Sequence, residues 1–266
     1  MPSSIGNLRC LETLDLRIDL DRSVSPYIPR VPNVFKYMKQ LKHLYLPFEY
    51  RVCGKLELAN LSYLQTLLNV QLNTIQIPTW CKLNRLRVLK VRNNKRAQDA
   101  MQMLISRCPL VEKLNLCNRI KKLPEVQKFS QNLAKLTLCD TCLEEDPMPT
   151  LEKLLNLKIL RLLRYSFKGK DMVCSKGGFP LLQYLLLSEL DKLEKWSMKE
   201  GAMPSLCHLI ISDCDNLKIL DGLMFVTTLQ ELKLDKKDRL HEVRHVPPLY
   251  LKTVTKTMTK NVQQLQ

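Results

Sequence analysis

Residues 154–162 read Leu154-Leu155-Asn156-Leu157-Lys158-Ile159-Leu160-Arg161-Leu162, an instance of the pattern apolar-x-x-Leu-x-x-Leu-x-apolar. Ten copies of this pattern follow one another along the 266-residue chain. Aligned on the second apolar position, they fall at residues 11, 41, 64, 86, 111, 133, 157, 182, 206 and 229. Eight of the nine intervals are 22–25 residues long, so the chain is built from a structural repeat.

Each copy predicts a short strand, because alternate side chains of a strand point to the same side. One repeat cannot bury its own leucines, so successive repeats must stack and share a core. The sequence therefore predicts an α/β fold, a leucine-rich-repeat solenoid (horseshoe) of about ten repeats with a parallel concave sheet. The rest of each repeat would return over an irregular convex side, with a helix within residues 95–106.

The ends of the array and one weak copy need separate predictions. We expect residues 1–248 to form the leucine-rich-repeat domain and residues 249–266 a polar C-terminal tail. Leu8 begins the first repeat, and Leu11, Leu14 and Leu16 are expected to be exposed along an unpaired sheet edge. In the third copy, Asn69 takes the last apolar position.

Composition limits the protein class. No apolar run approaches the length of a membrane-spanning helix, and no signal peptide is recognisable, so we expect a cytoplasmic protein without stable membrane insertion. The ten cysteines are then expected to be reduced thiols, although Cys139 and Cys142 have the spacing of a zinc knuckle.

The formal net charge of +16 is concentrated in one part of the chain, since residues 82–128 hold 13 basic and 3 acidic side chains. Such a field attracts nucleic acid, anionic membrane or an acidic protein surface. Trp80 is the only aromatic residue adjoining this run before Phe129, which disfavours a base-stacking surface. We therefore expect protein partners and no nucleic acid. The proposed basic docking band comprises Arg85, Arg87, Lys90, Arg92, Lys95 and Arg96.

The sequence contains one match to a known catalytic motif. His241-Glu-Val-Arg-His245 has the form His-Glu-x-x-His, in which two histidines one helical turn apart bind zinc. Val246-Pro-Pro248 follows at once and leaves no long helix to hold the pair, so a zinc peptidase is a minor alternative. We expect no enzymatic activity, no catalytic residues, no metal and no cofactor.

The central residue between the two strand anchors of each repeat should point outward on the concave face. A row that mixes charge, aromatic and aliphatic side chains is typical of protein recognition. Leu186 and Ile210 should adjoin on successive strands. The predicted protein-binding residues are Tyr45, Lys90, Asn115, Thr137, Arg161, Leu186, Ile210 and Lys233.

Several stretches resemble a known family. Pro2-Ser-Ser-Ile-Gly-Asn-Leu-Arg-Cys-Leu-Glu-Thr-Leu-Asp-Leu-Arg17 is similar to a repeat of plant intracellular nucleotide-binding leucine-rich-repeat disease resistance proteins of the coiled-coil class. Asp146–Leu160, Glu200–Leu206 and Gly222–Leu232 are similar to later repeats, so the resemblance covers about residues 1–248. The chain has no Gly-x-x-x-x-Gly-Lys-Ser/Thr loop, and nucleotide binding is therefore not implied.

The resemblance implies a protein-interaction repeat domain of a plant immune receptor. Such a domain recognises a pathogen-derived or host protein, regulates the receptor, or does both. The implied partners are a pathogen effector and the nucleotide-binding module of the same receptor. The alternative is the substrate-recognition repeat domain of an F-box-type ubiquitin ligase subunit, because Cys108-Pro-Leu-Val-Glu-Lys-Leu-Asn-Leu116 resembles repeats of plant F-box proteins.

Overall fold

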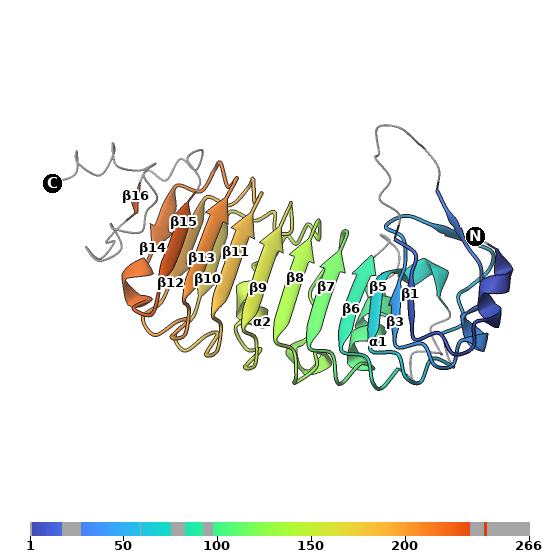
Figure 1. The fold of residues 1–266 in the computed structure, drawn as a ribbon. Helices are drawn as coiled ribbons and strands as arrows, with labels where there is room; N and C mark the ends of the chain where they lie inside the picture. Colours follow the sequence, from blue (N-terminus) through green and yellow to red (C-terminus); the bar gives the residue numbers. More distant parts are fainter. Residues whose placement is uncertain are drawn as a thin grey trace. The chain divides into compact units, whose positions relative to one another are not determined.

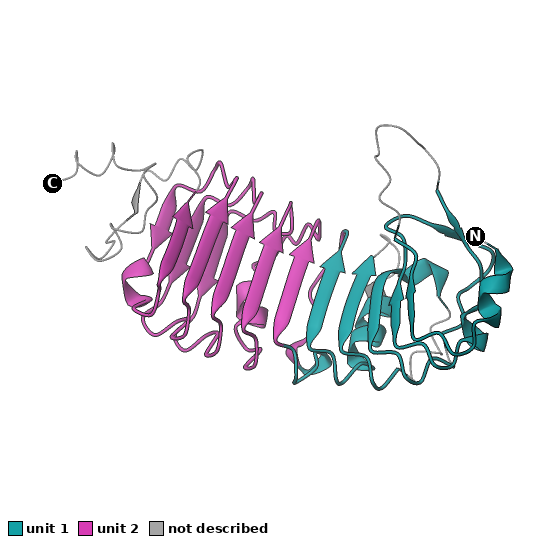
Figure 2. Ribbon diagram, in the orientation of Figure 1, with its two compact units in different colours: residues 1–118, 127–133 teal, residues 119–126, 134–266 magenta. Residues whose placement is uncertain are grey.

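The computed structural model describes residues 2–17, 28–58, 60–75, 83–92, 98–234 and 242–243. The chain divides into two compact units (Figure 2). Unit 1 comprises residues 1–118 and 127–133, and unit 2 comprises residues 119–126 and 134–266. The expected tail, residues 249–266, lies outside the described part.

Unit 1 is built on a parallel sheet in the order β1-β3-β5-β6-β7, with one strand from each repeat (Figure 1). These strands are β1 (Thr13–Asp15), β3 (His43–Tyr45), β5 (Thr66–Gln71), β6 (Val88–Arg92) and β7 (Lys113–Cys117). A second parallel pair joins β2 (Arg30–Val31) to β4 (Arg51–Val52). The return segments contain the helix α1 (Gln98–Ser106) and the 3-10 helices η1 (Ser3–Asn7), η2 (Phe35–Tyr37) and η3 (Leu72–Thr74).

Unit 2 has two parallel sheets, one behind the other in Figure 1. Its main sheet has the order β8 (Lys135–Cys139), β9 (Ile159–Leu163), β11 (Tyr184–Ser188), β13 (His208–Ser212) and β15 (Glu231–Leu234). The second sheet has the order β10 (Asp171–Cys174), β12 (Lys195–Met198), β14 (Ile219–Asp221) and β16 (Glu242–Val243). Its short helices are α2 (Met148–Leu151) and the 3-10 helix η6 (Leu223–Phe225), and a further 3-10 helix, η5, spans Val126–Lys128.

The repeated leucines form the core. Leu160, Leu185 and Leu209 lie in register on β9, β11 and β13, and each is fully buried. The repeat length of 24 or 25 residues brings each leucine beside its counterpart in the next repeat, so the buried column continues from strand to strand. The parallel sheets, with few helices, give the α/β leucine-rich-repeat solenoid that the pattern predicts.

The second sheet of unit 2 is a feature that the repeat pattern did not predict. Met172, Trp196 and Leu220 occupy matching positions on β10, β12 and β14, and all three are fully buried. They recur at a spacing of 24 residues. The return segments of these repeats therefore form a second sheet, and the core of unit 2 lies between this sheet and the main sheet.

The third repeat corrects one prediction. Asn69 does not fill the core position, because the pairing of β5 with β6 shifts between Leu67 and Val70 and Val70 is the fully buried residue. The extra residue is accommodated by Asn69 at a φ of 61°, a left-handed conformation that asparagine tolerates better than most residues.

The first repeat corrects two further predictions about which leucines are buried. Leu8 is 51% exposed and does not enter the core. Leu14 and Leu16 are buried, not exposed, because β1 pairs with β3 and their side chains turn inward; Leu11 is half-buried. Of the four anchors of this repeat, only Leu14 and Leu16 are therefore fully part of the core.

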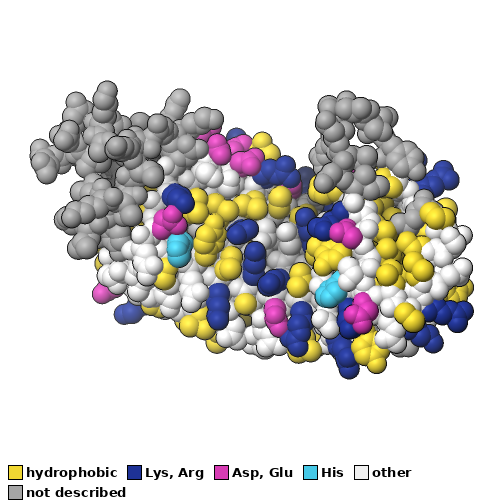
Figure 3. Space-filling view, viewed as in Figure 1, with side chains coloured by type: hydrophobic (Ala, Val, Ile, Leu, Met, Phe, Trp, Pro, Cys, Tyr) yellow, Lys and Arg dark blue, Asp and Glu magenta, His cyan; other side chains and the backbone are white. Residues whose placement is uncertain are grey.

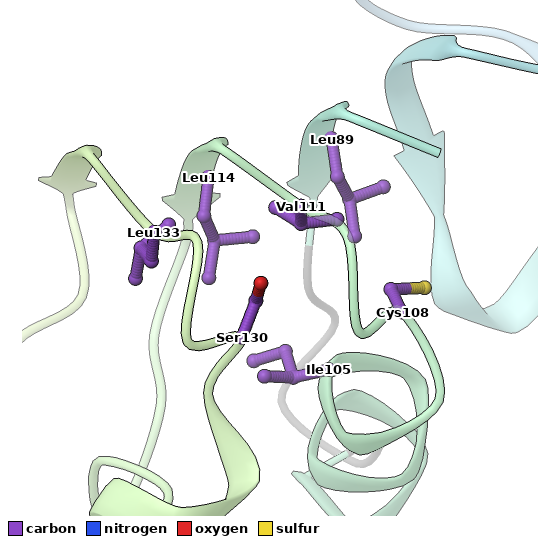
Figure 4. Close-up of a pocket in the computed structure, with 7 residues that line it drawn as sticks. All are labelled: Leu89, Ile105, Cys108, Val111, Leu114, Ser130 and Leu133. Carbon is purple, nitrogen blue, oxygen red and sulfur yellow. The ribbon is translucent and has the colours of Figure 1, made fainter. Parts of the chain in front are cut away.

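The predicted helix is present as α1, which buries Met101, Leu104 and Ile105. Beside it, Ser130 stands where most repeats have a large apolar residue. Its hydroxyl donates a hydrogen bond to the carbonyl oxygen of Pro109 at 2.6 Å. The shorter side chain leaves a cavity of about 10 Å³, with Leu114 and the other lining side chains around it (Figure 4).

Candidate functional site

The candidate binding site is the outer face of the main sheets, where alternate strand side chains point away from the core. In unit 1 this outer face consists of Thr13, Asp15, His43, Tyr45, Thr66, Leu68, Gln71, Val88, Lys90, Arg92, Lys113, Asn115 and Cys117. In unit 2 it consists of Lys135, Thr137, Cys139, Ile159, Arg161, Leu163, Tyr184, Leu186, Ser188, His208, Ile210, Ser212, Glu231 and Lys233. Figure 3 looks onto these faces and shows basic side chains interspersed with apolar ones.

Two in-register pairs lie side by side on β11 and β13. Leu186 is opposite Ile210, as the sequence predicts, and both are half-buried rather than fully exposed. Two residues earlier on each strand, and on the same face, Tyr184 is opposite His208, and their ring centroids are 6.2 Å apart. These four side chains form a continuous apolar and aromatic surface on two adjacent strands.

Arg161 of β9 borders this surface. Its neighbours on the same face of β9 are Ile159 and Leu163, and Leu186 lies opposite it on β11; all three are half-buried. The Cζ atom of Arg161 lies 5.3 Å from the centroid of the Tyr184 ring, within the range of a cation–π contact. Within the described part of the chain, its Nε is buried and has no hydrogen-bond partner.

Two other cations of unit 2 are already paired. Lys233 Nζ lies 2.7 Å from Glu231 Oε1 on the same strand, and this hydrogen bond lowers the pKa of Glu231 and raises that of Lys233. Arg164, which follows β9, lies 3.2 Å from Asp140 Oδ2. The charges of these two side chains are therefore partly neutralised within the fold.

Thr137 is a correction among the predicted binding residues. It has the expected outward position on β8, in register with Arg161, but it is only 7% exposed. A short side chain beside a long arginine offers little surface to a partner. Thr137 therefore supports the face without being available for contact.

The outer face of unit 1 centres on Tyr45 of β3. The ring of His43 is stacked with that of Tyr45 at a centroid distance of 6.5 Å, and His43 Nδ1 lies 3.1 Å from Thr66 Oγ1. Arg17 Cζ lies 4.7 Å from the centroid of the Tyr45 ring. Arg17 also hydrogen-bonds to the carboxylate of Asp15, which lowers the pKa of Asp15.

Lys90 and Asn115 lie at matching outward positions on β6 and β7, as predicted, and both are half-buried. Asn115 Oδ1 accepts a hydrogen bond from the thiol of Cys117 at 3.0 Å. Arg92, two residues after Lys90 on the same face, places its Cζ 3.3 Å from the centroid of the Phe48 ring. This part of unit 1 thus carries cationic and polar groups close together.

The basic docking band is brought together only in part. Arg85 and Arg87 precede β6 and are exposed, whereas Lys90 and Arg92 lie on β6 itself. Arg87 forms an ion pair with Glu112, which neutralises part of the band. Lys95 and Arg96 lie outside the described residues.

Aromatic rings also reach this band, which sequence proximity did not reveal. Arg85 Cζ lies 4.8 Å from the centroid of the Tyr63 ring, and Arg92 lies over Phe48. Tyr63 and Arg85 occupy the same position of consecutive repeats, so alignment of the repeats, rather than adjacency in the chain, was the signal that could have found the pair. Both rings have a guanidinium over them, and those ring faces are not free for base stacking.

The motifs with metal-binding spacing do not assemble a site in the described residues. Glu242 and Val243 form a strand that pairs with β14, whereas a zinc-binding His-Glu-x-x-His motif requires a helix; His241 and His245 are not described. Cys139 and Cys142 are not joined by a disulfide bond. No group of three or more His, Cys, Asp or Glu residues that could hold a metal ion occurs in the described part of the chain.

The cavity beside α1 is not a ligand site, because its volume of about 10 Å³ is at most that of one water molecule. Among the residues that the structure describes, no helix has the length and apolar character needed to cross a membrane.

Comparison with known proteins identifies the repeat. A family model described as "Leucine-rich repeat region" matches residues 1–247. Disease resistance protein RPP8 of Arabidopsis thaliana is 35% identical over 277 residues, covering 93% of this chain and 30% of that protein. Disease resistance RPP8-like protein 3 of the same plant is 34% identical over 286 residues, covering 93% and 31%. The chain therefore spans about a third of the length of these relatives.

Solved structures align less closely. An internalin from Listeria monocytogenes gives a TM-score of 0.46 at 16% identity, covering 80% of this chain and 75% of that chain. The plant peptide hormone receptor RGFR1 in complex with RGF2 gives a TM-score of 0.38 at 14% identity, covering 87% and 52%. From the family model that spans nearly the whole chain, and from its similarity to plant disease resistance proteins, we conclude that the chain belongs to the leucine-rich repeat region family.

Proposed function

We propose that the chain is the protein-recognition part of a plant immune receptor. It binds a pathogen-derived or host protein through the outer face of its main sheets and thereby contributes to a defence response. Its role is recognition and regulation rather than catalysis, and we place the receptor in the cytoplasm. The relatives named above favour this role over that of an F-box-type ubiquitin ligase subunit.

One observation carries the proposal. Leu186, Ile210, Tyr184 and His208 form a continuous surface on adjacent strands, bordered by Arg161. Tyrosine and arginine are among the residue types that dominate binding energy at protein interfaces, and the aliphatic pair adds apolar area that a partner can bury. Strand pairing already fixes the backbone at these positions, which lowers the entropy cost of binding.

The basic docking band is proposed as a second contact. We place an acidic surface of the nucleotide-binding module of the same receptor against Arg85, Arg87, Lys90 and Arg92, with Lys95 and Arg96 continuing the band. The charge of residues 82–128 supports this, since electrostatic complementarity speeds association and fixes orientation. Reversal of Arg85 and Lys90 to glutamate should weaken binding of that module, and unchanged affinity would contradict the proposal. Added salt should also weaken it, because exposed charges are screened over ~10 Å at 0.1 M salt.

The immune role is tested by genetics. Plants that lack the gene encoding this chain are compared with the parent line against a panel of pathogen strains, and the intact gene is then restored. We expect loss of resistance to at least one strain and recovery on restoration. Unchanged resistance across a broad panel would contradict an immune role.

A further inference from the structure

Arg161 is held in an apolar environment. Ile159 and Leu163 lie on either side of it along β9, Leu186 lies across from it on β11, and all three are half-buried. Tyr184 lies below the guanidinium at a centroid distance of 5.3 Å. Water has reduced access to a charge in such a place, and an ion pair formed there is stronger than one in bulk solvent.

The described part of the fold provides no counter-ion for this guanidinium. Within the described residues no carboxylate lies within ion-pair distance of Arg161, and its buried Nε donates no hydrogen bond. Lys233 and Arg164, in contrast, have Glu231 and Asp140 as partners. A half-buried guanidinium that has no carboxylate partner among the described residues presents a planar set of donors whose geometry matches a carboxylate.

The apolar pair Leu186 and Ile210 beside Arg161 determines what a bound segment must carry in addition to a carboxylate. Leu186 is on the adjacent strand and Ile210 on the strand after it, all three at the same position along their strands. Neighbouring strands are about 4.8 Å apart, so Arg161 and the Leu186–Ile210 pair are separated by roughly 5–10 Å. Two residues of an extended peptide that point the same way are about 6.6 Å apart, which matches this separation.

We infer that this part of the outer face binds a protein segment in which an acidic residue stands two positions from a large aliphatic or aromatic residue. The segment crosses the strands, its carboxylate pairs with Arg161, and its apolar side chain packs on Leu186 and Ile210. The inference rests on the proposed function and specifies the chemistry of the partner. Charge complementarity with Arg161 favours the acidic residue of the segment. The apolar surface favours the aliphatic or aromatic residue two positions away.

The test is selection of random short peptides on the purified chain, followed by calorimetric titration of the most enriched peptide. We expect enriched peptides to carry Asp or Glu two positions from Leu, Ile, Met or Phe. Arg161→Gln should weaken binding about ten- to a hundredfold, as loss of a charged hydrogen-bonded pair usually does, and Arg161→Lys should fall in between. The matched control Arg164→Gln, whose arginine is already paired with Asp140, should change the affinity by less than about threefold.

A second experiment changes the enriched peptide instead of the protein. Replacing its acidic residue by the corresponding amide should weaken binding to the native chain as much as Arg161→Gln does. The two changes together should be no worse than either alone, because both remove the same contact. Circular dichroism of each variant confirms that the fold is retained.

Three results would overturn the inference. They are enriched peptides without the acidic residue, equal affinity for the Arg161→Gln variant, and a single-stranded RNA oligonucleotide that binds more tightly than any peptide and depends on Arg161. A library that yields no enriched peptide also counts against it. The proposed function has its own genetic test, so the inference can fail while that function stands.

Discussion

The side-chain amide of Asn69 donates a hydrogen bond from Nδ2 to the carbonyl oxygen of Leu46 at 2.9 Å, joining the third repeat to the second at the point where β5 carries an extra residue. Asn69 is buried and its φ is 61°. One residue thus supplies both the backbone conformation of the bulge and a partner for a carbonyl group of the neighbouring repeat.

Replacing this residue tests that dual role. Asn69→Ala should lower the free energy of unfolding by roughly 1–3 kcal/mol, because the Leu46 carbonyl loses a donor and alanine disfavours positive φ. Asn69→Gly should cost less, since glycine adopts this φ freely. Urea unfolding of the three proteins measures the order, and equal stability of the alanine and native chains would contradict it.

The leucine column predicts a contrast within a single repeat. Leu160 is fully buried and Leu155, five residues earlier, is 63% exposed. Leu160→Ala should cost about 2–5 kcal/mol of unfolding free energy through lost burial and a residual cavity. Leu155→Ala should stay within about 0.5 kcal/mol of the native chain in the same denaturant titration. Similar losses for both would contradict the assignment of the core.

Thiol reactivity should follow burial. Burial raises the pKa of Cys108 to about 12 and, together with smaller effects, that of Cys174 to about 12, so neither forms a thiolate at pH 8. Cys10 and Cys53 are exposed. Iodoacetamide followed by peptide mass spectrometry should label Cys10 and Cys53 in the native chain, and Cys108 and Cys174 only after denaturation. Labelling of all four at one rate would contradict the packing.

Asp146 predicts a pH dependence of stability. Burial raises its pKa above the ordinary 3.8, and the charges of Glu152 and Asp171 add to this, while hydrogen bonds from the backbone N–H groups of Met148 and Val173 oppose it. The native state therefore binds a proton more readily than the unfolded state. This contribution to stability is fully present below the unfolded pKa and is lost as the pH rises through the raised native pKa.

The comparison is with Asp146→Asn, which cannot titrate. The stability of the native chain relative to this variant should increase as the pH falls from neutral towards the unfolded pKa of Asp146. Urea midpoints of both proteins across this range measure the difference. A difference that is constant, or that grows with rising pH, would contradict the environment assigned to Asp146.

The repeat pattern predicts the fold because each strand needs only two inward leucines, such as Leu160 and Leu162, at a constant spacing. The pattern gives the wrong core residue where the local structure departs from this spacing. At Asn69 a bulge moves the core position to Val70, and Leu8 of the first repeat is exposed. The second sheet of unit 2 had a visible signal, the 24-residue spacing of Met172, Trp196 and Leu220, which the leucine pattern alone does not include.

The outward direction of the predicted binding residues follows from strand alternation and was predictable. Their exposure was not, because it depends on the length of neighbouring side chains. Thr137 is buried although it points outward, and Arg161 is half-buried among aliphatic residues. Contacts between repeats, such as that of Arg92 with Phe48, depend on three-dimensional stacking and are not apparent from neighbouring positions in the chain.

The most direct test of protein recognition by the outer face is restoration of disease resistance with a face variant. Leu186→Glu/Ile210→Lys replaces the apolar pair by opposite charges that tolerate each other across adjacent strands. Its matched control is Met224→Glu/Phe225→Lys, which makes the same change at two exposed apolar residues away from the outer face. Both variants are first shown to fold by circular dichroism and are then introduced into plants that lack the gene. The account predicts that the control restores resistance and the face variant does not; full restoration by the face variant would contradict it.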